Sequence, residues 1–290
     1  MIPLINSYFS GCGIMELGFY AQGLPIQQSF EIDADCCRVH RDNFEHPVSE
    51  VDITQKLVLE DHHCDAMIGT FPCTKYSKVA DIHGTRTGDA LFLHFMRHVA
   101  IAQPEVFVIE NVPGMLAFPV VMEAFEKLPG YKTKLFHRVE AHYWLPQRRR
   151  RVMLFGSKKR FTWIEPKQED RIQLADIVEE EPQVSMPKAV ATRMNGGYRD
   201  LPIISDPAKN DLAPTCVAHY AKDKSTRLLK DHRYPLGVRP YSVREFARLQ
   251  GVADGFSFNC SPTSAYKMIG NGVPKQMGEW VAKNIKKYFN

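Results

Sequence analysis

The sequence has no hydrophobic run long enough to cross a membrane. A transmembrane helix needs about 18 or more consecutive apolar residues, and no stretch of this 290-residue chain reaches that length. The chain passes from Met1 straight into a strand-like segment, with no basic region and no cleavage site of small residues, which argues against a secretory signal. These absences exclude an integral membrane protein and predict a cytoplasmic one.

The sequence also lacks the cysteine pattern of a disulfide framework or a structural zinc site. Its seven cysteines are odd in number, and no two of them have Cys-x-x-Cys spacing. In a reducing compartment we expect them to stay free and to bind no metal. Cys73 stands out because it follows a proline at the end of an apolar run, in GTFPCTKYSK. It is therefore either a packing residue or a nucleophile.

The net charge of +4 is small, but the basic residues are unevenly distributed. Residues 147–160 contain seven Lys or Arg and no acid, and residues 213–248 contain eight against three acids. Clustered positive charge favours a polyanion such as nucleic acid as the partner. A solvated basic surface is the alternative.

Short apolar runs alternate with helix-length amphipathic segments over the first 155 residues. The strands expected are 4–9, 27–32, 65–70, 106–111, 134–140 and 152–157, and the helices are 14–22, 34–44, 89–103 and 119–128. Gly or Pro follows each helix. This alternation predicts an α/β fold with a doubly wound, Rossmann-like, mainly parallel sheet covered by helices on both faces.

The alternation stops between residues 161 and 235, where Pro and Gly are scattered and periodicity is weak. We expect a small, loop-rich inserted domain there, with residues 1–160 and 236–290 forming the catalytic, cofactor-binding domain. Helices return at 242–251, where Ser242 and Glu245 have capping-box spacing, and at 275–289.

Ligands of such sheets bind beyond the carboxyl ends of the strands. The first strand ends in the glycine turn Phe9–Gly13, although Glu16 stands where a dinucleotide fingerprint has its third glycine. Glu31 ends the second strand at the spacing of an acid that binds ribose hydroxyls, and Asp52 follows the second helix. Together they indicate an adenosine-containing cofactor, either a nicotinamide dinucleotide or S-adenosyl-L-methionine.

Taken in order along the chain, these segments resemble the DNA (cytosine-5) methyltransferase family of the prokaryotic or phage type, with a single chain and a short target-recognition region. The matching segments are Phe9–Gly13, Phe30-Glu31, Asp52-Ile53, Phe71-Pro72-Cys73 with Tyr76-Ser77 after it, Glu110-Asn111-Val112, Gln147–Arg151, residues 239–251 and Gly270–Pro274. Three positions depart from the family pattern: Thr74 replaces Gln, Gly272 replaces Ser or Ala, and residues 87–92 lack the usual Arg.

The resemblance implies transfer of a methyl group from S-adenosyl-L-methionine to C5 of a cytosine flipped out of a specific duplex DNA sequence, without a metal, leaving S-adenosyl-L-homocysteine. Because C5 is a poor nucleophile, a thiolate first adds to C6, and this role is assigned to Cys73. The resemblance also implies that Glu110 binds cytosine N3 and its exocyclic amine, that Arg151 binds O2, and that Arg149 lies nearby. The cofactor-binding residues implied are Phe9, Ser10, Gly11, Cys12, Gly13, Glu31, Ile32, Asp52, Ile53, Pro72, Leu91, Asn271 and Val273.

Residues 161–235 correspond in position to the target-recognition domain of the family. Arg is suited to guanine and Asn to adenine in the major groove. The candidate DNA-binding residues are Ser77, Arg193, Asn195, Tyr198, Arg199, Thr215, His219, Lys222, Lys224 and Arg227. The partners expected are double-stranded DNA and a cognate restriction endonuclease, with the enzyme a monomer in the cytoplasm of a prokaryotic cell or a phage-infected host.

Three other functions are compatible with parts of the sequence. One branch of the family methylates tRNA, but its Cys-Phe-Thr signature is missing from residues 161–235. A catalytically silent DNA-binding relative would not need Cys73, Glu110 and Arg151 together. A nicotinamide oxidoreductase would share only the cofactor turn and the acids.

Overall fold

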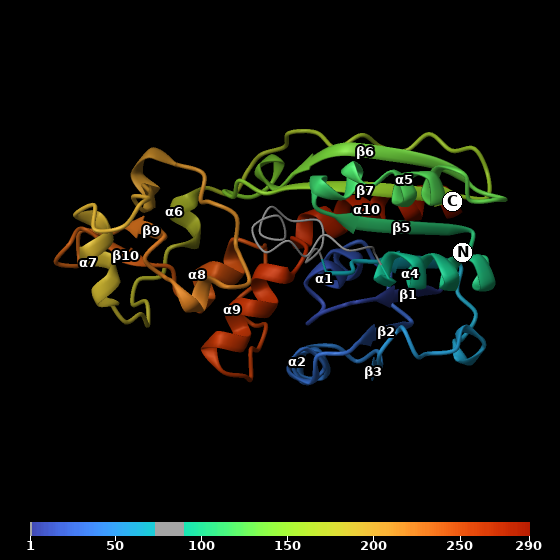
Figure 1. Ribbon diagram of the computed structural model, residues 1–290, viewed down its shortest axis with the longest axis horizontal. Helices are drawn as coiled ribbons and strands as arrows, with labels where there is room; N and C mark the ends of the chain where they lie inside the picture. Colours follow the sequence, from blue (N-terminus) through green and yellow to red (C-terminus); the bar gives the residue numbers. More distant parts are fainter. Residues whose placement is uncertain (1, 73–89) are drawn as a thin grey trace. The chain divides into compact units, whose positions relative to one another are not determined.

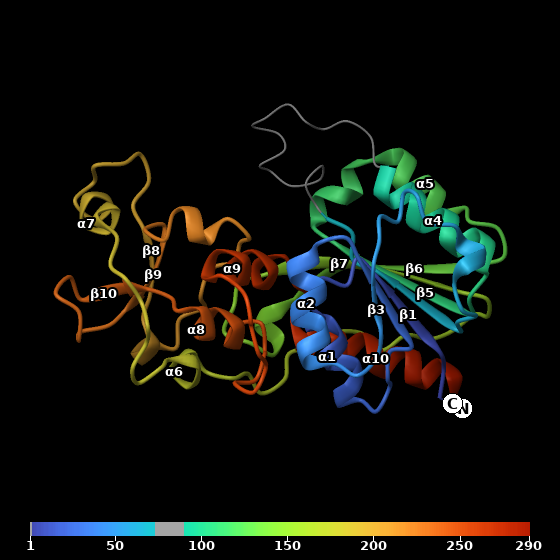
Figure 2. The same ribbon diagram turned by 90° about the horizontal axis from the view of Figure 1, so that it is seen from below.

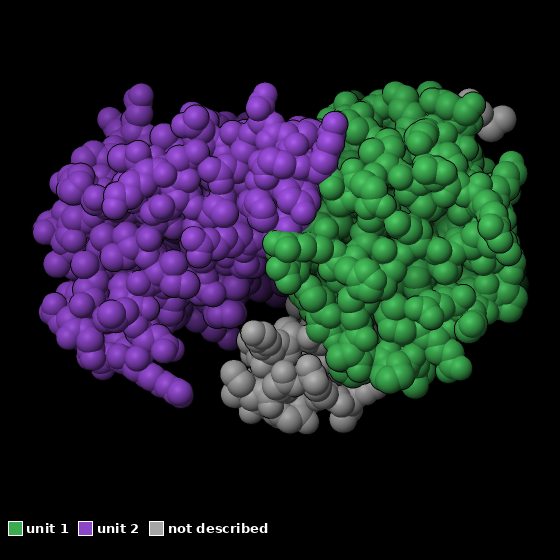
Figure 3. Space-filling view, turned by 90° about the horizontal axis from the view of Figure 1, so that it is seen from above, with its two compact units in different colours: residues 1–139, 150–166, 277–290 green, residues 140–149, 167–276 purple. Residues whose placement is uncertain are grey.

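The computed structural model describes residues 2–72 and 90–290 (Figure 1). The chain divides into two compact units, which Figure 3 shows in different colours. Unit 1 comprises Met1–Val139, Arg150–Pro166 and Met277–Asn290, and unit 2 comprises Glu140–Arg149 and Lys167–Gln276.

Unit 1 is built on a sheet that has seven strands within the described residues, in the order β3-β2-β1-β4-β5-β7-β6 (Figures 1 and 2). The strands are β1 (Ile5–Tyr8), β2 (Gln28–Glu31), β3 (Val48–Glu50), β4 (Ala66–Gly69), β5 (Val106–Asn111), β6 (Lys132–Glu140) and β7 (Arg150–Ser157). Strands β1 to β5 pair in parallel, whereas β7 is antiparallel to β5. The predicted mainly parallel, doubly wound sheet is confirmed, and β3 is the addition to it.

Helices cover both faces of this sheet. Helices α1 (Ile14–Ala21), α2 (Ala34–Asn43) and α10 (Lys275–Phe289) lie on one face, and α4 (Ala90–Ala102) and α5 (Pro119–Glu126) lie on the other (Figure 2). The contact between α10 and α1 depends on a glycine, because a Cβ added at Gly278 would lie 2.2 Å from the carbonyl oxygen of Met15. The C-terminal helix is thereby held against the helix that follows the first strand.

An aromatic core fills the space between the sheet and helices α4 and α5. Phe92, Phe95, Phe107 and Phe125 are buried there, and Tyr131 donates its hydroxyl hydrogen to a backbone carbonyl at 2.7 Å. This core supports the strands whose carboxyl ends carry the candidate site.

Unit 2 contains a smaller sheet and several short helices. Its strands β8 (Ile203–Ser205), β9 (Arg227–Lys230) and β10 (Val238–Pro240) are accompanied by helices α6 (Leu174–Ile177), α7 (Lys188–Met194), α8 (Val243–Arg248) and α9 (Pro262–Asn271). The predicted capping box of Ser242 and Glu245 begins α8. Short 3-10 helices occupy Ala141–Tyr143, Pro207–Lys209 and Tyr220–Lys222 in unit 2, and Val58–Glu60 and Pro113–Ala117 in unit 1.

The second unit differs in extent from the predicted inserted domain at 161–235. Strand β10 lies beyond residue 235 and pairs antiparallel with β9, and the Gln147 amide donates to the carbonyl of Leu249 at 2.7 Å. Residues 140–149 and 236–276 therefore fold with the second unit, because hydrogen bonds distant in sequence join them to it.

No helix within residues 2–72 and 90–290 is both long enough and apolar enough to cross a membrane.

Candidate active site

The turn after β1 has the backbone of a close-approach loop. Phe9, Gly11 and Gly13 all have positive φ angles, of 60°, 58° and 86°. A Cβ added at Gly13 would lie 2.4 Å from the ring of Phe44, so this position requires glycine for both its conformation and its space. The turn leads into the N-terminus of α1, where backbone N–H groups are available to a ligand.

The carboxylate of Glu31 is fixed beside this turn. Its Oε2 accepts from the backbone N–H of Gly11 at 2.7 Å, and its Oε1 accepts from the N–H groups of Ile32 and Asp33 at 2.8 and 2.9 Å. A carboxylate has about four lone-pair sites, so acceptor capacity remains on Oε2. The Ile32 side chain is 62% exposed at the same strand end, where it offers an apolar surface.

Asp52 and Ile53 lie beyond β3, the strand next to β2. Asp52 accepts from the backbone N–H of Thr54 at 2.9 Å, and hydrogen bonds from Thr54 lower the pKa of this carboxyl group. The Ile53 side chain is buried, and its carbonyl accepts from Arg97 at 3.0 Å. Asp52 therefore offers a carboxylate at this edge, whereas Ile53 anchors the segment in the core.

The segment that leads to the predicted nucleophile is tied to its neighbours. The Thr70 hydroxyl donates to the carbonyl of Phe9 at 2.9 Å, and the Asn111 amide donates to the carbonyl of Phe71 at 3.1 Å. Pro72 is exposed at the end of this segment. Cys73 and Ser77 follow it in sequence and lie outside the described residues, while Leu91 packs against the aromatic core.

Glu110 and Arg151 form an ion pair at the end of the sheet where the parallel strands have their carboxyl ends. Glu110 is near the end of β5 and Arg151 is near the start of β7, and their Oε1 and Nε atoms are 2.8 Å apart. Their side chains are only 7% and 12% exposed. The antiparallel pairing of β5 with β7 thus brings together an acid and a guanidinium group that are distant in sequence.

Arg149 has a different environment from the one predicted. It is 1% exposed, and its guanidinium donates to the carbonyls of Cys216 at 2.9 Å, Gly272 at 2.7 Å and Gly270 at 3.2 Å. Arg149 instead holds the turn that presents the exposed side chain of Asn271 and the buried side chain of Val273.

The predicted DNA-binding residues of unit 2 divide into exposed and engaged side chains. The exposed ones are Asn195, Tyr198, Arg199, His219 and Lys222. Arg193 differs from the prediction because it is 9% exposed and donates to Ser225 at 2.8 Å and to Asp223 at 2.9 Å. Its guanidinium therefore forms hydrogen bonds inside unit 2.

The other predicted DNA-binding residues are partly buried. The Lys224 ammonium lies 4.8 Å from the centre of the Tyr266 ring, and desolvation lowers its pKa. Thr215 donates to the carbonyl of Arg148, and Arg227 donates to the Thr226 hydroxyl at 3.2 Å.

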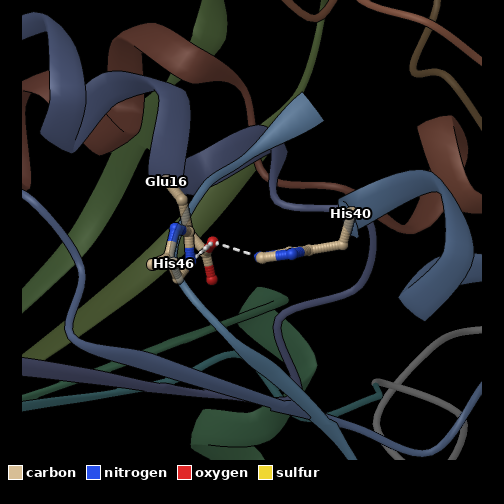
Figure 4. Close-up of side chains that lie close together, drawn as sticks. All are labelled: Glu16, His40 and His46. Carbon is tan, nitrogen blue, oxygen red and sulfur yellow. Dashed lines mark hydrogen bonds and ion pairs between the residues drawn. The ribbon is translucent and has the colours of Figure 1, made fainter. Parts of the chain in front are cut away.

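One buried cluster was not predicted as part of the site. The Oε2 atom of Glu16 lies 3.0 Å from Nε2 of both His40 and His46 (Figure 4), and its Oε1 accepts from the Ser29 hydroxyl at 2.8 Å. Burial by itself would raise the pKa of Glu16, but the hydrogen bonds from the two histidines outweigh it and hold the pKa below its ordinary value. In sequence, Glu16 was visible only as a missing glycine.

Two imidazoles and a carboxylate are also ligands that zinc uses, and the three ligand atoms lie within 4.8 Å of one another. Each neighbour of the Glu16 carboxylate is, however, a hydrogen-bond donor of suitable geometry. Hydrogen bonding therefore accounts for the cluster.

The C-5 cytosine-specific DNA methylase family model matches residues 5–287. Similar curated proteins include the type II methyltransferase M.NgoPII of Neisseria gonorrhoeae, at 29% identity over 98% of this chain and 95% of that protein. M1.HphI of Haemophilus parahaemolyticus is 28% identical over 96% of this chain and 85% of that protein.

Solved structures with the same fold include the Entamoeba histolytica methyltransferase EhMeth, with a TM-score of 0.81, 15% identity and coverage of 99% of this chain and 98% of that one. A putative DNA modification methyltransferase from an Escherichia coli prophage has a TM-score of 0.73 at 21% identity, with 99% of both chains covered. The family model spans nearly the whole chain, which therefore belongs to the C-5 cytosine-specific DNA methylase family and is a DNA cytosine-5 methyltransferase.

Proposed function

We propose that the protein transfers the methyl group of S-adenosyl-L-methionine to C5 of a cytosine flipped out of a specific duplex DNA sequence, through a covalent adduct between Cys73 and C6. The observation that carries this proposal is the buried ion pair of Glu110 and Arg151, 2.8 Å apart at the carboxyl end of β5. An acid and a guanidinium group side by side match the pairing edge of cytosine, which presents an amine, N3 and O2.

The residues around the β1 turn fit the cofactor. Glu31 retains acceptor capacity on Oε2 for a ribose hydroxyl, Ile32 offers an exposed apolar side chain for the adenine ring, and Asp52 supplies a further acceptor. The positive φ of Gly11 and the open space at its Cβ position let the ligand approach the backbone closely. When bound, S-adenosyl-L-methionine supplies an electrophilic methyl group.

The chain supplies the groups that activate the base. The Cys73 thiolate adds to C6 while the Glu110 carboxyl group gives a proton to N3, and C5 becomes an enamine-like carbon that takes the methyl group. A water molecule then takes the C5 proton, which expels the thiolate and restores the C5–C6 double bond, and N3 returns its proton to Glu110. Before the base binds, Glu110 forms an ion pair with Arg151 at 2.8 Å. When the base binds, Arg151 turns to O2 and Glu110 takes a proton from solvent.

Unit 2 is proposed to hold the DNA. Asn195, Tyr198, Arg199, His219 and Lys222 are exposed and include hydrogen-bond donors of the kinds that read bases and phosphates. In a duplex, the neighbouring bases cover the reacting atoms of the target cytosine. The cytosine therefore has to flip out of the stack, as it does in methyltransferases generally. In this proposal Arg193 and Arg149 shape the protein rather than touch the base.

Bisulfite sequencing of plasmid DNA from cells that express the protein tests the function directly. We expect protected cytosines at one short sequence and none elsewhere. Purified protein should methylate duplex DNA and leave tRNA unmodified, and the reverse preference would refute the choice of DNA. If the protein acts with a cognate restriction endonuclease, that methylation should block cleavage at the same sequence.

The nucleophile is tested with Cys73→Ser and a matched cysteine variant. Cys73→Ser should abolish methylation while DNA binding is retained, because a hydroxyl group has far too little anion at neutral pH to add to C6. Cys260→Ser is the control, since Cys260 lies in unit 2 and has no part in the proposed chemistry. Undiminished methylation by Cys73→Ser would remove Cys73 as the nucleophile.

A further inference from the structure

The cluster centred on Glu16 joins the segments that carry the proposed cofactor contacts. Glu16 lies in the first turn of α1, directly after the turn Phe9–Gly13, and Ser29 lies on β2 two residues before Glu31. His40 belongs to α2, which follows Glu31 in sequence, and His46 precedes β3, which leads to Asp52. One buried carboxylate therefore bonds to segments that lead to Glu31 and Asp52, and it lies on the helix that follows the turn Phe9–Gly13 (Figure 4).

The chemistry of the cluster requires a carboxylate at its centre. The Oε2 atom accepts from two imidazole N–H groups at 3.0 Å, and Oε1 accepts from the Ser29 hydroxyl at 2.8 Å. Because an ionised carboxylate only accepts, Nε2 of His46 carries the hydrogen that faces Glu16, and Nδ1 of that ring accepts from the Tyr20 hydroxyl at 2.7 Å. A glutamine at position 16 would turn an N–H group toward at least one of these donors.

The cluster also reaches the glycine turn through an aromatic side chain. The ring of Phe44 lies between the cluster and Gly13: its centre is 4.7 Å from that of His40 and 5.2 Å from that of His46. A Cβ at Gly13 would lie 2.4 Å from the same ring. A shift of either histidine is thus transmitted to Phe44 and to the turn on which the cofactor is proposed to rest.

We infer that Glu16, His40 and His46 are positioning residues for the cofactor: their buried hydrogen bonds set the turn Phe9–Gly13 and the strand end at Glu31 in the geometry that binds S-adenosyl-L-methionine. None of the three touches the reacting atoms. This inference rests on the proposed cofactor site and adds to it a supporting layer, of the kind that holds binding groups in place.

Calorimetric titration with S-adenosyl-L-homocysteine tests the inference. Glu16→Gln and His40→Leu should bind at least about tenfold more weakly than the wild type. His40→Gln should restore most of the affinity, because its amide N–H can replace the Nε2–H donor. Because none of the three residues touches the reacting atoms, Glu16→Gln and His40→Leu should raise the KM for the cofactor and change kcat little.

A matched buried variant separates positioning from loss of stability. Asn284 is fully buried in unit 1, and it accepts from the backbone N–H of Ile164 at 2.6 Å and donates to the carbonyl of Trp280 at 3.0 Å. Asn284→Ala should lower the melting temperature without weakening the cofactor complex. Equal affinity in Glu16→Gln and wild type, or an equal loss of affinity in Asn284→Ala, would overturn the inference.

Two further outcomes are distinguishable. If the wild type itself fails to bind S-adenosyl-L-homocysteine, the proposed cofactor site fails rather than its supporting layer. Stoichiometric zinc found by mass spectrometry in the purified wild type and absent from Glu16→Gln would replace the hydrogen-bonded cluster with a metal site and overturn the inference.

Discussion

The Arg149→Met variant is expected to lose stability rather than the chemical step. In the structure the guanidinium of Arg149 is 1% exposed and donates to the carbonyls of Cys216, Gly270 and Gly272. Methionine has a similar length but no donor, so these carbonyls would lose their charged partner. A buried carbonyl left without its donor costs about 1–3 kcal/mol, so we expect the loss of three such partners to cost about 3–5 kcal/mol in total.

This loss can be followed by thermal unfolding. For a domain of this size each kcal/mol lowers the melting temperature by roughly 2–4 °C, which predicts a fall of about 10 °C. At a temperature where the variant remains folded, we expect kcat within about threefold of the wild type, because less than about 0.7 kcal/mol of the barrier is then affected. Arg148→Met is the control for stability, since Arg148 is exposed and adjacent in sequence.

Arg151 should show its main loss in the chemical step. Its Nε atom is 2.8 Å from Glu110, and in the proposed mechanism it donates to the base. Arg151→Met is expected to reduce kcat by about 10²–10³, the usual effect of deleting one donor to a developing charge. A melting temperature unchanged in Arg149→Met together with a comparable loss of kcat would show that Arg149 also contacts the cytosine, and the reasoning above would be refuted.

Three other predictions concern packing and pH. Gly278→Ala should destabilise the protein by about 1–3 kcal/mol in urea denaturation, because the new Cβ meets the carbonyl of Met15, whereas Gly255→Ala has open space and should not. Tyr131→Phe removes a buried hydroxyl donor at 2.7 Å and should cost about 1–3 kcal/mol, measured in the same way. Since hydrogen bonds hold the pKa of Glu16 below its ordinary value, its contribution is complete above the unfolded pKa of about 4.3 and is lost as the pH falls further. The difference in unfolding free energy between the wild type and Glu16→Gln should therefore shrink below pH of about 4, and an equal difference at neutral and acid pH would contradict this.

Local pattern was sufficient for most of unit 1. Strand β5 and helix α10 have the bounds predicted for them, 106–111 and 275–289, since an apolar run or an amphipathic period is a property of adjacent residues. Strand β3 was missed because its three residues are too few to show alternation. Helix α9 was missed as well, although Ser261 caps it and a proline follows in its first turn, which is a sequence signal that was available.

The extent of unit 2 depends on contacts that adjacent residues do not reveal. Strand β10 lies outside the predicted boundary, and its pairing with β9 and the bonds of Arg239 to Asp231 and Glu245 join it to the second unit. The roles of three arginines illustrate the same limit. Arg149, Arg151 and Arg193 look alike in sequence, yet one holds backbone carbonyls, one pairs with Glu110 and one is bound by Asp223 and Ser225.

The sequence by itself determined the family, the order of the strands and helices in the catalytic fold, and the position of the glycine turn with its acids, because each of these is written in short contiguous motifs. Only the tertiary structure decided which charged side chains lie at the site and which are buried and hydrogen-bonded in the interior. Glu16 is the clearest case: the residue that breaks the glycine pattern is the buried carboxylate to which two histidines and a serine donate. Its partners come from β2, α2 and the loop before β3, and hydrogen bonds between such distant residues form only once the chain has folded.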